Sequence, residues 1–112
     1  MKFDIKKVKI VVMVPESHIE KIRTAACKLG AEVIGNYSFC TTSSNVIGTF
    51  LPNADARPYI GFNGNLEHVE EVKLEFVCDI NIACQVVAEL RKTHPYEETA
   101  IDIIPLLEEK DL

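Results

Sequence analysis

The residue types best suited to chemistry in this sequence occur together in His94-Pro95-Tyr96-Glu97-Glu98. Imidazole and carboxylate groups bind metal ions and transfer protons, so this segment could be a metal site or an acid–base site. In an extended chain, however, neighbouring side chains point to opposite sides, so Glu97 and Glu98 would diverge. The alternative is a corner between a helix and a strand, where His94 ends the helix and Pro95 prevents its continuation. We favour the corner, and any metal-binding role here falls to His94 and Glu98.

Cys40 is a second candidate, because it lies in a polar loop close to Tyr37 and Ser38. A nucleophilic cysteine needs a nearby base and a lowered thiol pKa, and only folding could bring a histidine close to this one. The four cysteines form no C-x-x-C pair, so a structural zinc site has weak support. We expect an unreactive loop thiol unless the fold gives Cys40 a partner.

The segment from Gly35 to Gly48 is rich in Gly, Asn, Ser and Thr, which can form backbone nests for anions. The sequence contains neither G-x-x-x-x-G-K-[ST] nor G-x-G-x-x-G, so no phosphate-binding motif supports this function. The alternative is a surface loop or a contact between copies of the chain. The irregular pattern continues to residue 65, and such a long stretch in a small domain is typical of a functional loop or of several short strands.

The apolar periodicity predicts the elements that must position these residues. Alternation at period two indicates strands, and apolar stripes at helical spacing indicate two helices. Ser17 stands three residues before Glu20, a capping-box pattern that opens the first helix, which ends at Leu29 before Gly30. The predicted strands lie at 7–14, near 31–37, at 46–51, at 72–78 and at 100–105, and the second helix spans about 82–92.

This order predicts one domain, residues 1–112, of class α+β: a ferredoxin-like sandwich, βαββαβ with an extra β insertion. One antiparallel sheet would carry both helices on one face and leave the other face bare. The stretch from Val11 to Val14 is apolar on both faces of its strand, so the bare face needs a cover. We expect that cover to be another copy of the chain.

Composition excludes several classes of partner. The formal net charge is −5 and no run of Lys or Arg occurs, so neither nucleic acid nor an anionic membrane surface is an expected partner. The apolar stretches are far shorter than the ~20 residues that span a bilayer. The N-terminal segment carries Asp4 and alternating lysines and has no small-residue cleavage site, so we expect a cytoplasmic protein.

Several motifs, in this order, resemble those of the domain inserted into the NGG-interacting-factor-three family, also called YqfO or "GTP cyclohydrolase type 2-like". They are Ile34-Gly35-Asn36-Tyr37-Ser38-x-Cys40, Gly48-Thr49-Phe50-x-Pro52, Pro58-Tyr59-Ile60-Gly61-x-x-Gly64-x-Leu66-Glu67, His94-Pro95-Tyr96-Glu97-Glu98 and Asp102-Ile103-x-Pro105-Leu106. The resemblance extends from about Val8 to Leu106. It implies a fold similar to that of the PII signalling proteins and of CutA, which are usually trimeric, and CutA carries a similar His-Pro-Tyr-Glu stretch.

The sequence also departs from this family. Longer members flank the inserted domain with halves that hold a dinuclear metal site built from several histidines, aspartate and glutamate. This chain has three histidines and resembles the inserted domain alone, as a standalone unit. The family's metal ligands therefore have no counterparts here. The segment after Pro52 also lacks the glycine that the family has before Pro58.

We therefore predict a non-catalytic PII/CutA-like module that binds a small ligand or a divalent metal ion in clefts between the subunits of a homotrimer. The predicted ligand-binding residues are Tyr37, Cys40, Thr49, Tyr59 and Tyr96, and the predicted metal ligands are His94, Glu98 and Cys40. The pairing of Cys40 with His94 around a soft metal rests on the similarity to CutA. The alternatives are a metal-dependent hydrolase related to the longer members and a purely structural assembly domain.

Overall fold

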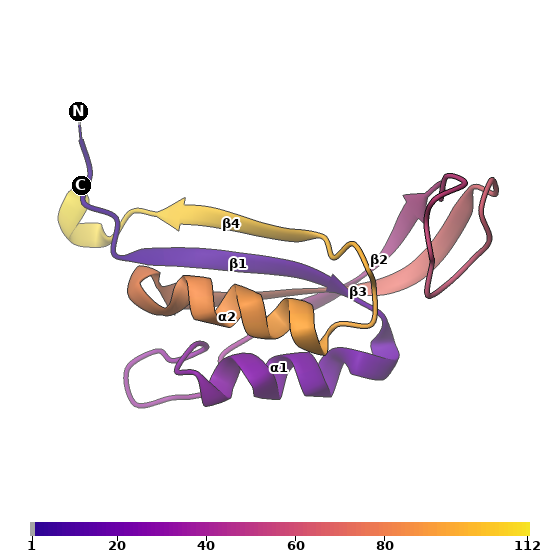
Figure 1. Cartoon of the computed structure of the whole chain (residues 1–112). Helices are drawn as coiled ribbons and strands as arrows, with labels where there is room; N and C mark the ends of the chain where they lie inside the picture. Colours follow the sequence, from indigo (N-terminus) through magenta and orange to yellow (C-terminus); the bar gives the residue numbers. More distant parts are fainter. Residues whose placement is uncertain (1) are drawn as a thin grey trace.

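The computed structural model describes residues 2–112 and contains one four-stranded sheet with two helices on one of its faces (Figure 1). The strands are β1 (Lys7–Val14), β2 (Thr42–Phe50), β3 (Glu67–Asp79) and β4 (Ile101–Leu106). The helices are α1 (Ile19–Lys28) and α2 (Ile80–Thr93), and single 3₁₀ turns occur at Glu16–His18 and Glu109–Asp111. The order in the sheet is β2-β3-β1-β4, and every neighbouring pair is antiparallel. The ferredoxin-like sandwich predicted from the sequence is therefore confirmed.

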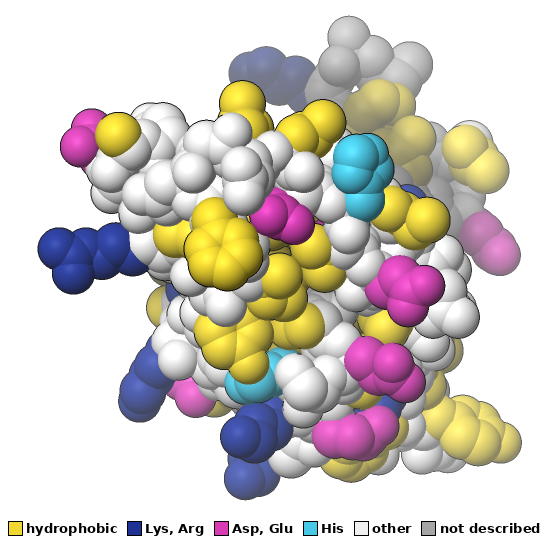
Figure 2. Space-filling view, turned by 90° about the vertical axis from the view of Figure 1, so that its right-hand side faces the viewer, with side chains coloured by type: hydrophobic (Ala, Val, Ile, Leu, Met, Phe, Trp, Pro, Cys, Tyr) yellow, Lys and Arg dark blue, Asp and Glu magenta, His cyan; other side chains and the backbone are white. Residues whose placement is uncertain are grey.

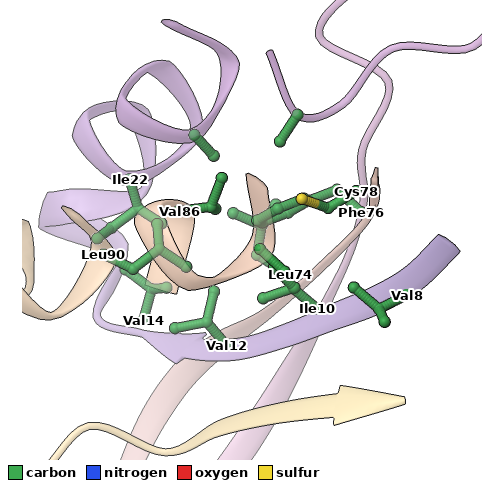
Figure 3. Close-up of a cluster of buried hydrophobic side chains, with 13 residues drawn as sticks. Val8, Ile10, Val12, Val14, Ile22, Leu74, Phe76, Cys78, Val86 and Leu90 are labelled. Carbon is green, nitrogen blue, oxygen red and sulfur yellow. The ribbon is translucent and has the colours of Figure 1, made fainter. Parts of the chain in front are cut away.

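The hydrophobic core lies between the helices and the inner face of the sheet (Figure 3). The strand register sets Val12 opposite Leu74, and Ile10 opposite Phe76, so apolar side chains of β1 and β3 share this face. Ile22, Val86 and Leu90 meet them from the helices, and none of the three is accessible to solvent. This core fixes the helices against the sheet, and the loops project from that framework.

The region between α1 and β2 differs from the prediction. Residues 31–37 form no strand; they turn back on themselves through paired backbone hydrogen bonds between Ile34 and Tyr37, each 2.9 Å. The physical reason is the backbone: Gly30, Glu32, Gly35 and Phe39 all have positive φ, which a continuous extended strand does not tolerate. The structure thus has four strands in its described part, without the additional one, and β2 begins earlier than predicted, at Thr42.

The predicted capping box at the start of the first helix is also absent. The chain enters α1 through the 3₁₀ turn, so His18 rather than Ser17 precedes the helix. The Ser17 hydroxyl bonds the His18 ring nitrogen Nδ1 at 2.8 Å instead of a helix N–H group. The turn is closed by the His18 N–H, which donates to the Pro15 carbonyl oxygen.

Within residues 2–112, the outer face of the sheet carries no helix (Figure 1). Apolar and charged residues alternate across it: Val11 stands opposite Glu75 and Asp102 in the two neighbouring strands. Val11 is only 4% exposed, whereas Ile104 on β4 is 45% exposed. This outer face is therefore partly apolar and, within one copy, uncovered by any other layer. In residues 2–112 no helix has the length and apolar character to cross a membrane.

Candidate ligand-binding cavity

One cavity of about 670 Å³ lies where the β2–β3 hairpin meets the end of β1 and the chain before β4. We call it the hairpin cavity. Its lining includes Met13 and Glu71 from the outer face of the sheet, so it opens on the side away from the helices. The rest of the lining comes from β2 and the following loop (48–53, 55, 56 and 58–60) and from residues 96–98 and 100.

His94 forms the corner that brings the last group of residues to the cavity. It is buried, and it ends α2 with extended backbone. The His94 ring atom Nε2 lies 2.7 Å from the Met13 carbonyl oxygen, and the Tyr96 N–H donates to Nδ1 at 3.1 Å. These bonds require the neutral tautomer with its proton on Nε2, and burial lowers the pKa of the imidazole. Both ring nitrogens are engaged, so a metal ion could bind His94 only by breaking one of these bonds.

Tyr96 stands at the centre of a row of rings. Its ring centroid lies 4.7 Å from that of His94 and 6.1 Å from that of Tyr59, and Tyr59 in turn lies 6.1 Å from His18. The Tyr96 hydroxyl is buried and has no hydrogen-bond partner among the described residues. Burial, the nearby negative charge of Glu71 and a weak hydrogen-bonding interaction with its carboxylate raise the pKa of this phenol, so it is un-ionised at neutral pH. It can therefore both donate and accept a hydrogen bond.

Hydrogen bonds hold the hairpin loop against the corner. The Arg57 N–H donates to the Glu97 carboxylate at 2.6 Å, which joins positions 40 residues apart. Within the loop, the Gly64 N–H donates to the Pro52 carbonyl oxygen at 2.7 Å, and the Asn63 amide donates to two further carbonyl oxygens. The loop is thus an organised wall of the cavity.

Glu71 and Gly48 form the floor of the cavity on the sheet. Glu71 is only 9% exposed, and a Cβ placed on Gly48 would collide with its carboxylate. The glycine therefore makes room for this side chain to lie along β2. Neither residue is among the site residues predicted from the sequence, because nothing in the sequence shows that residues 23 positions apart meet across a strand pair.

The cavity wall is acidic. Its charged residues are Asp55, Glu71, Glu97 and Glu98, and none of its lining residues in the described chain is Lys, Arg or His. Figure 2 looks onto this end of the molecule: hydrophobic side chains gather near the centre, with acidic ones beside them, while the prominent Lys and Arg side chains lie toward the left, lower and upper margins. The electrostatic environment therefore favours neutral or positively charged ligands.

The structure brings together some of the predicted site residues and separates others. Thr49, Tyr59, Tyr96 and Glu98 all line the hairpin cavity, and His94 lies behind Tyr96. Tyr37 and Cys40 belong to the turn after α1, which is tied to β3 through the Glu32 N–H bond to the Val77 carbonyl oxygen. Val77 lies six residues beyond Glu71, about 20 Å along the strand.

Cys40 therefore does not meet His94 and Glu98 within one copy of the chain. The Cys40 sulfur has a weak contact with the Ser38 carbonyl oxygen at 3.8 Å, and its N–H donates to the Glu32 carbonyl oxygen. In residues 2–112 no group of three or more His, Cys, Asp or Glu side chains is gathered closely enough to hold a metal ion.

Comparison with known proteins identifies relatives that are much longer than this chain. No family model matches the sequence. A GTP cyclohydrolase 1 type 2 homolog from Halalkalibacterium halodurans is 46% identical over 101 residues, which are 90% of this chain and 27% of that protein. The corresponding protein of Bacillus subtilis is 45% identical over 98 residues, 88% of this chain and 26% of its own length. The chain thus spans about a quarter of the length of these curated relatives.

Solved structures give the same picture. A Bacillus cereus protein related to NIF3 superposes with a TM-score of 0.81 at 39% identity, covering 96% of this chain and 27% of that one. CutA from Archaeoglobus fulgidus gives a TM-score of 0.68 at 16% identity, covering 91% and 85% of the two chains. The GlnK–ATP complex of Bacillus subtilis gives 0.62 at 20% identity, covering 90% and 84%. At these low identities the last two establish similarity of fold alone.

Proposed function

The chain is a homologue of the GTP cyclohydrolase 1 type 2 homologs over about a quarter of their length, and from this premise we propose that it is a non-catalytic ligand-binding module working as a homo-oligomer. The motifs of the sequence predicted this relationship, and the CutA-like and PII-like fold is confirmed as well. We assign the ligand site to the hairpin cavity.

The observation that carries the assignment is the form of the cavity. A volume of about 670 Å³ is within the range of small-molecule sites, which are mostly apolar with a few polar groups in defined positions. Phe50, Pro52 and Tyr59 supply apolar surface, and the buried Tyr96 hydroxyl supplies a polar group that has no partner in the described chain. Such a hydroxyl gains a hydrogen bond when a ligand binds, and that gain favours the bound state.

The proposed oligomer is a trimer, as the resemblance to PII and CutA implies. Its support is the outer face of the sheet, which no layer of the described chain covers and which exposes Ile104. Met13 and Glu71 belong both to this face and to the cavity lining. A second copy seated over Val11 would therefore border the cavity, which makes the ligand site a cleft between subunits.

A metal-dependent hydrolase remains the alternative that the longer relatives suggest. Their name refers to a cyclohydrolase, but the chain spans only about a quarter of their length. No observation on residues 2–112 favours a hydrolase, since no three of their potential metal ligands lie close enough together to hold a metal ion. The binding module is the function that the geometry supports better.

A thermal-shift screen tests the binding function. Nucleotides, amines, carboxylates and divalent ions are each added to the purified protein. We expect one class to raise the melting temperature, because a ligand present at 100 times its Kd stabilises the native state by about 2.7 kcal/mol. The Tyr96→Phe variant should lose much of that shift, whereas Tyr37→Phe should keep it, because Tyr37 lies outside the cavity and is 76% exposed. A ligand whose effect is equal in both variants would place the site elsewhere.

A further inference from the structure

We propose that the hairpin cavity takes a small organic cation, an amine or guanidinium group on an apolar or aromatic body, with Glu71 as its charge partner. The inference rests on the proposed function in one respect: the cavity must be the ligand site. It adds the chemical class of the ligand.

The first argument is the state of Glu71. Glu71 is only 9% exposed, yet none of the ion pairs of the described residues involves its carboxylate, and the hydrogen-bonding group that acts with it is the neutral Tyr96 hydroxyl. Burying an unpaired carboxylate costs free energy, and a cation placed beside it offsets that cost. Lys73, the nearest basic residue in sequence, pairs with Glu75 at 3.8 Å instead. Within residues 2–112 of one copy, Glu71 therefore has no cationic partner.

The second argument is the buried hydroxyl of Tyr96, for which the described chain provides no hydrogen bond of regular geometry. The charge of Glu71 acts on this hydroxyl, so the two groups are close together in the cavity. An ammonium or guanidinium group carries several N–H donors. It can donate to the carboxylate and to the phenol oxygen at the same time. A single bound group would thus give Glu71 a cationic partner and Tyr96 a hydrogen bond.

The third argument concerns the body of the ligand. Tyr59 and Tyr96 stand 6.1 Å apart with their planes inclined by 46°, and Phe50 lies on the same cavity wall. Aromatic rings at this spacing offer faces that attract a cation and surfaces that hold an apolar group. The lining therefore favours an organic amine with an apolar carbon skeleton. Ammonia and hydrated inorganic ions fit it less well.

The same inventory excludes two other classes of ligand as good fits. A phosphate in the cavity would face four carboxylates, those of Asp55, Glu71, Glu97 and Glu98, and the lining of the described chain contains no Lys, Arg or His. The negative charges of the phosphate and of these carboxylates repel one another. A divalent cation needs several converging oxygen ligands, and in residues 2–112 no three carboxylates lie close enough together to bind one. The GlnK structure, which is similar in fold, contains ATP, so this chain would differ from GlnK in the charge of its ligand.

The test uses three probes with the same phenyl ring and two-carbon arm, whose polar groups are cationic, neutral and anionic: 2-phenylethylamine, 2-phenylethanol and phenylacetate. Binding is measured by calorimetry on the whole chain at low and moderate salt. We expect the amine to bind more tightly than the alcohol, and phenylacetate to bind least. We expect added salt to weaken only the amine.

The matched variants are Glu71→Gln and Glu75→Gln, on the same face of the same strand. Glu71→Gln should weaken the amine by about tenfold or more, since a hydrogen bond to a charged group is worth roughly 1.5–3 kcal/mol. Glu75→Gln should leave it unchanged, because Glu75 is not part of the cavity lining. Equal binding of the amine to both variants would overturn the role of Glu71.

The outcomes separate this inference from the proposed function. If the alcohol or phenylacetate binds as tightly as the amine and Tyr96→Phe weakens it, the cavity is a ligand site and the cation inference is wrong. If no probe binds at millimolar concentration, and the thermal-shift screen also finds no ligand, both proposals fail. Should Glu71→Gln not fold, the ranking of the three probes on the unaltered chain still decides the matter.

Discussion

At the scale of single residues, Glu32 is the most unusual side chain of the molecule. It is completely buried, both of its carboxylate oxygens lack hydrogen-bond partners in the described chain, and its φ of 66° is rare for a residue with a Cβ. Burial raises the pKa of this carboxyl from 4.5 to about 7, and the positive charge of Arg23 opposes the shift. Glu32 is therefore largely protonated in the folded protein below neutral pH.

The consequence is a pH dependence of stability. Because the pKa of Glu32 is higher in the folded state than in the unfolded chain, the folded state binds the proton more tightly. The contribution of this tighter proton binding to the free energy of unfolding is complete below about pH 4.5 and is lost as the pH rises through about 7. We expect Glu32→Gln, which cannot ionise, to unfold at higher urea than the unaltered chain at pH 8, by on the order of 1–3 kcal/mol, and to differ little at pH 5. A difference that is the same at both pH values would contradict this.

His94 gives a second prediction at this scale. Its ring links the end of β1 to the start of the 96–100 segment through bonds to the Met13 carbonyl oxygen and the Tyr96 N–H. His94→Ala removes both bonds and leaves a void in the corner. We expect a loss of about 3 kcal/mol or more in urea unfolding. His68→Ala is the control, since His68 is exposed on β3, and a similar loss in both variants would show that the corner has no special role.

At the scale of elements, the β2–β3 pair decides the form of the cavity. Gly48 stands opposite Val69, and its missing Cβ is what admits the Glu71 carboxylate. Gly48→Ala should displace that carboxylate, destabilise the chain by about 1–2 kcal/mol, and abolish ligand-induced thermal shifts. Ser44→Ala on the same face of β2 is the matched control and should retain them. Crystals of Gly48→Ala with Glu71 unmoved would contradict this account.

The elements also show how far sequence reasoning reaches. The periodic apolar residues of β1, β3 and α2 predicted these elements, because each buries one face on a common core. The first half of β2 was missed, since Thr42–Asn45 is polar and exposed on both faces and carries no apolar alternation. Four predicted site residues do gather at the cavity, but Glu71 and Gly48 meet only through the strand register, which local patterns do not encode.

At the scale of the whole molecule, the shape is extended for its size. The radius of gyration is 15.6 Å and the principal extents are 49 × 33 × 23 Å, whereas a compact chain of this length has a radius of about 13 Å. The difference comes from the β2–β3 hairpin, which projects beyond the helices (Figure 1). Its connecting loop exposes Leu51, Tyr59, Phe62 and Leu66. A projecting arm with apolar side chains gains stability when it packs on a neighbouring copy.

The oligomer is accordingly the last prediction. Equilibrium sedimentation should give about three times the 12.5 kDa chain mass. Ile104→Glu introduces a charge on the outer face of β4 and should dissociate the assembly, because an unpaired charge in an interface is costly. Ile103→Glu, on the opposite face of the same strand and similarly exposed, should leave the assembly intact. A monomer at all concentrations would mean that the outer face stays solvated, and the hairpin cavity would then have to bind its ligand within a single copy.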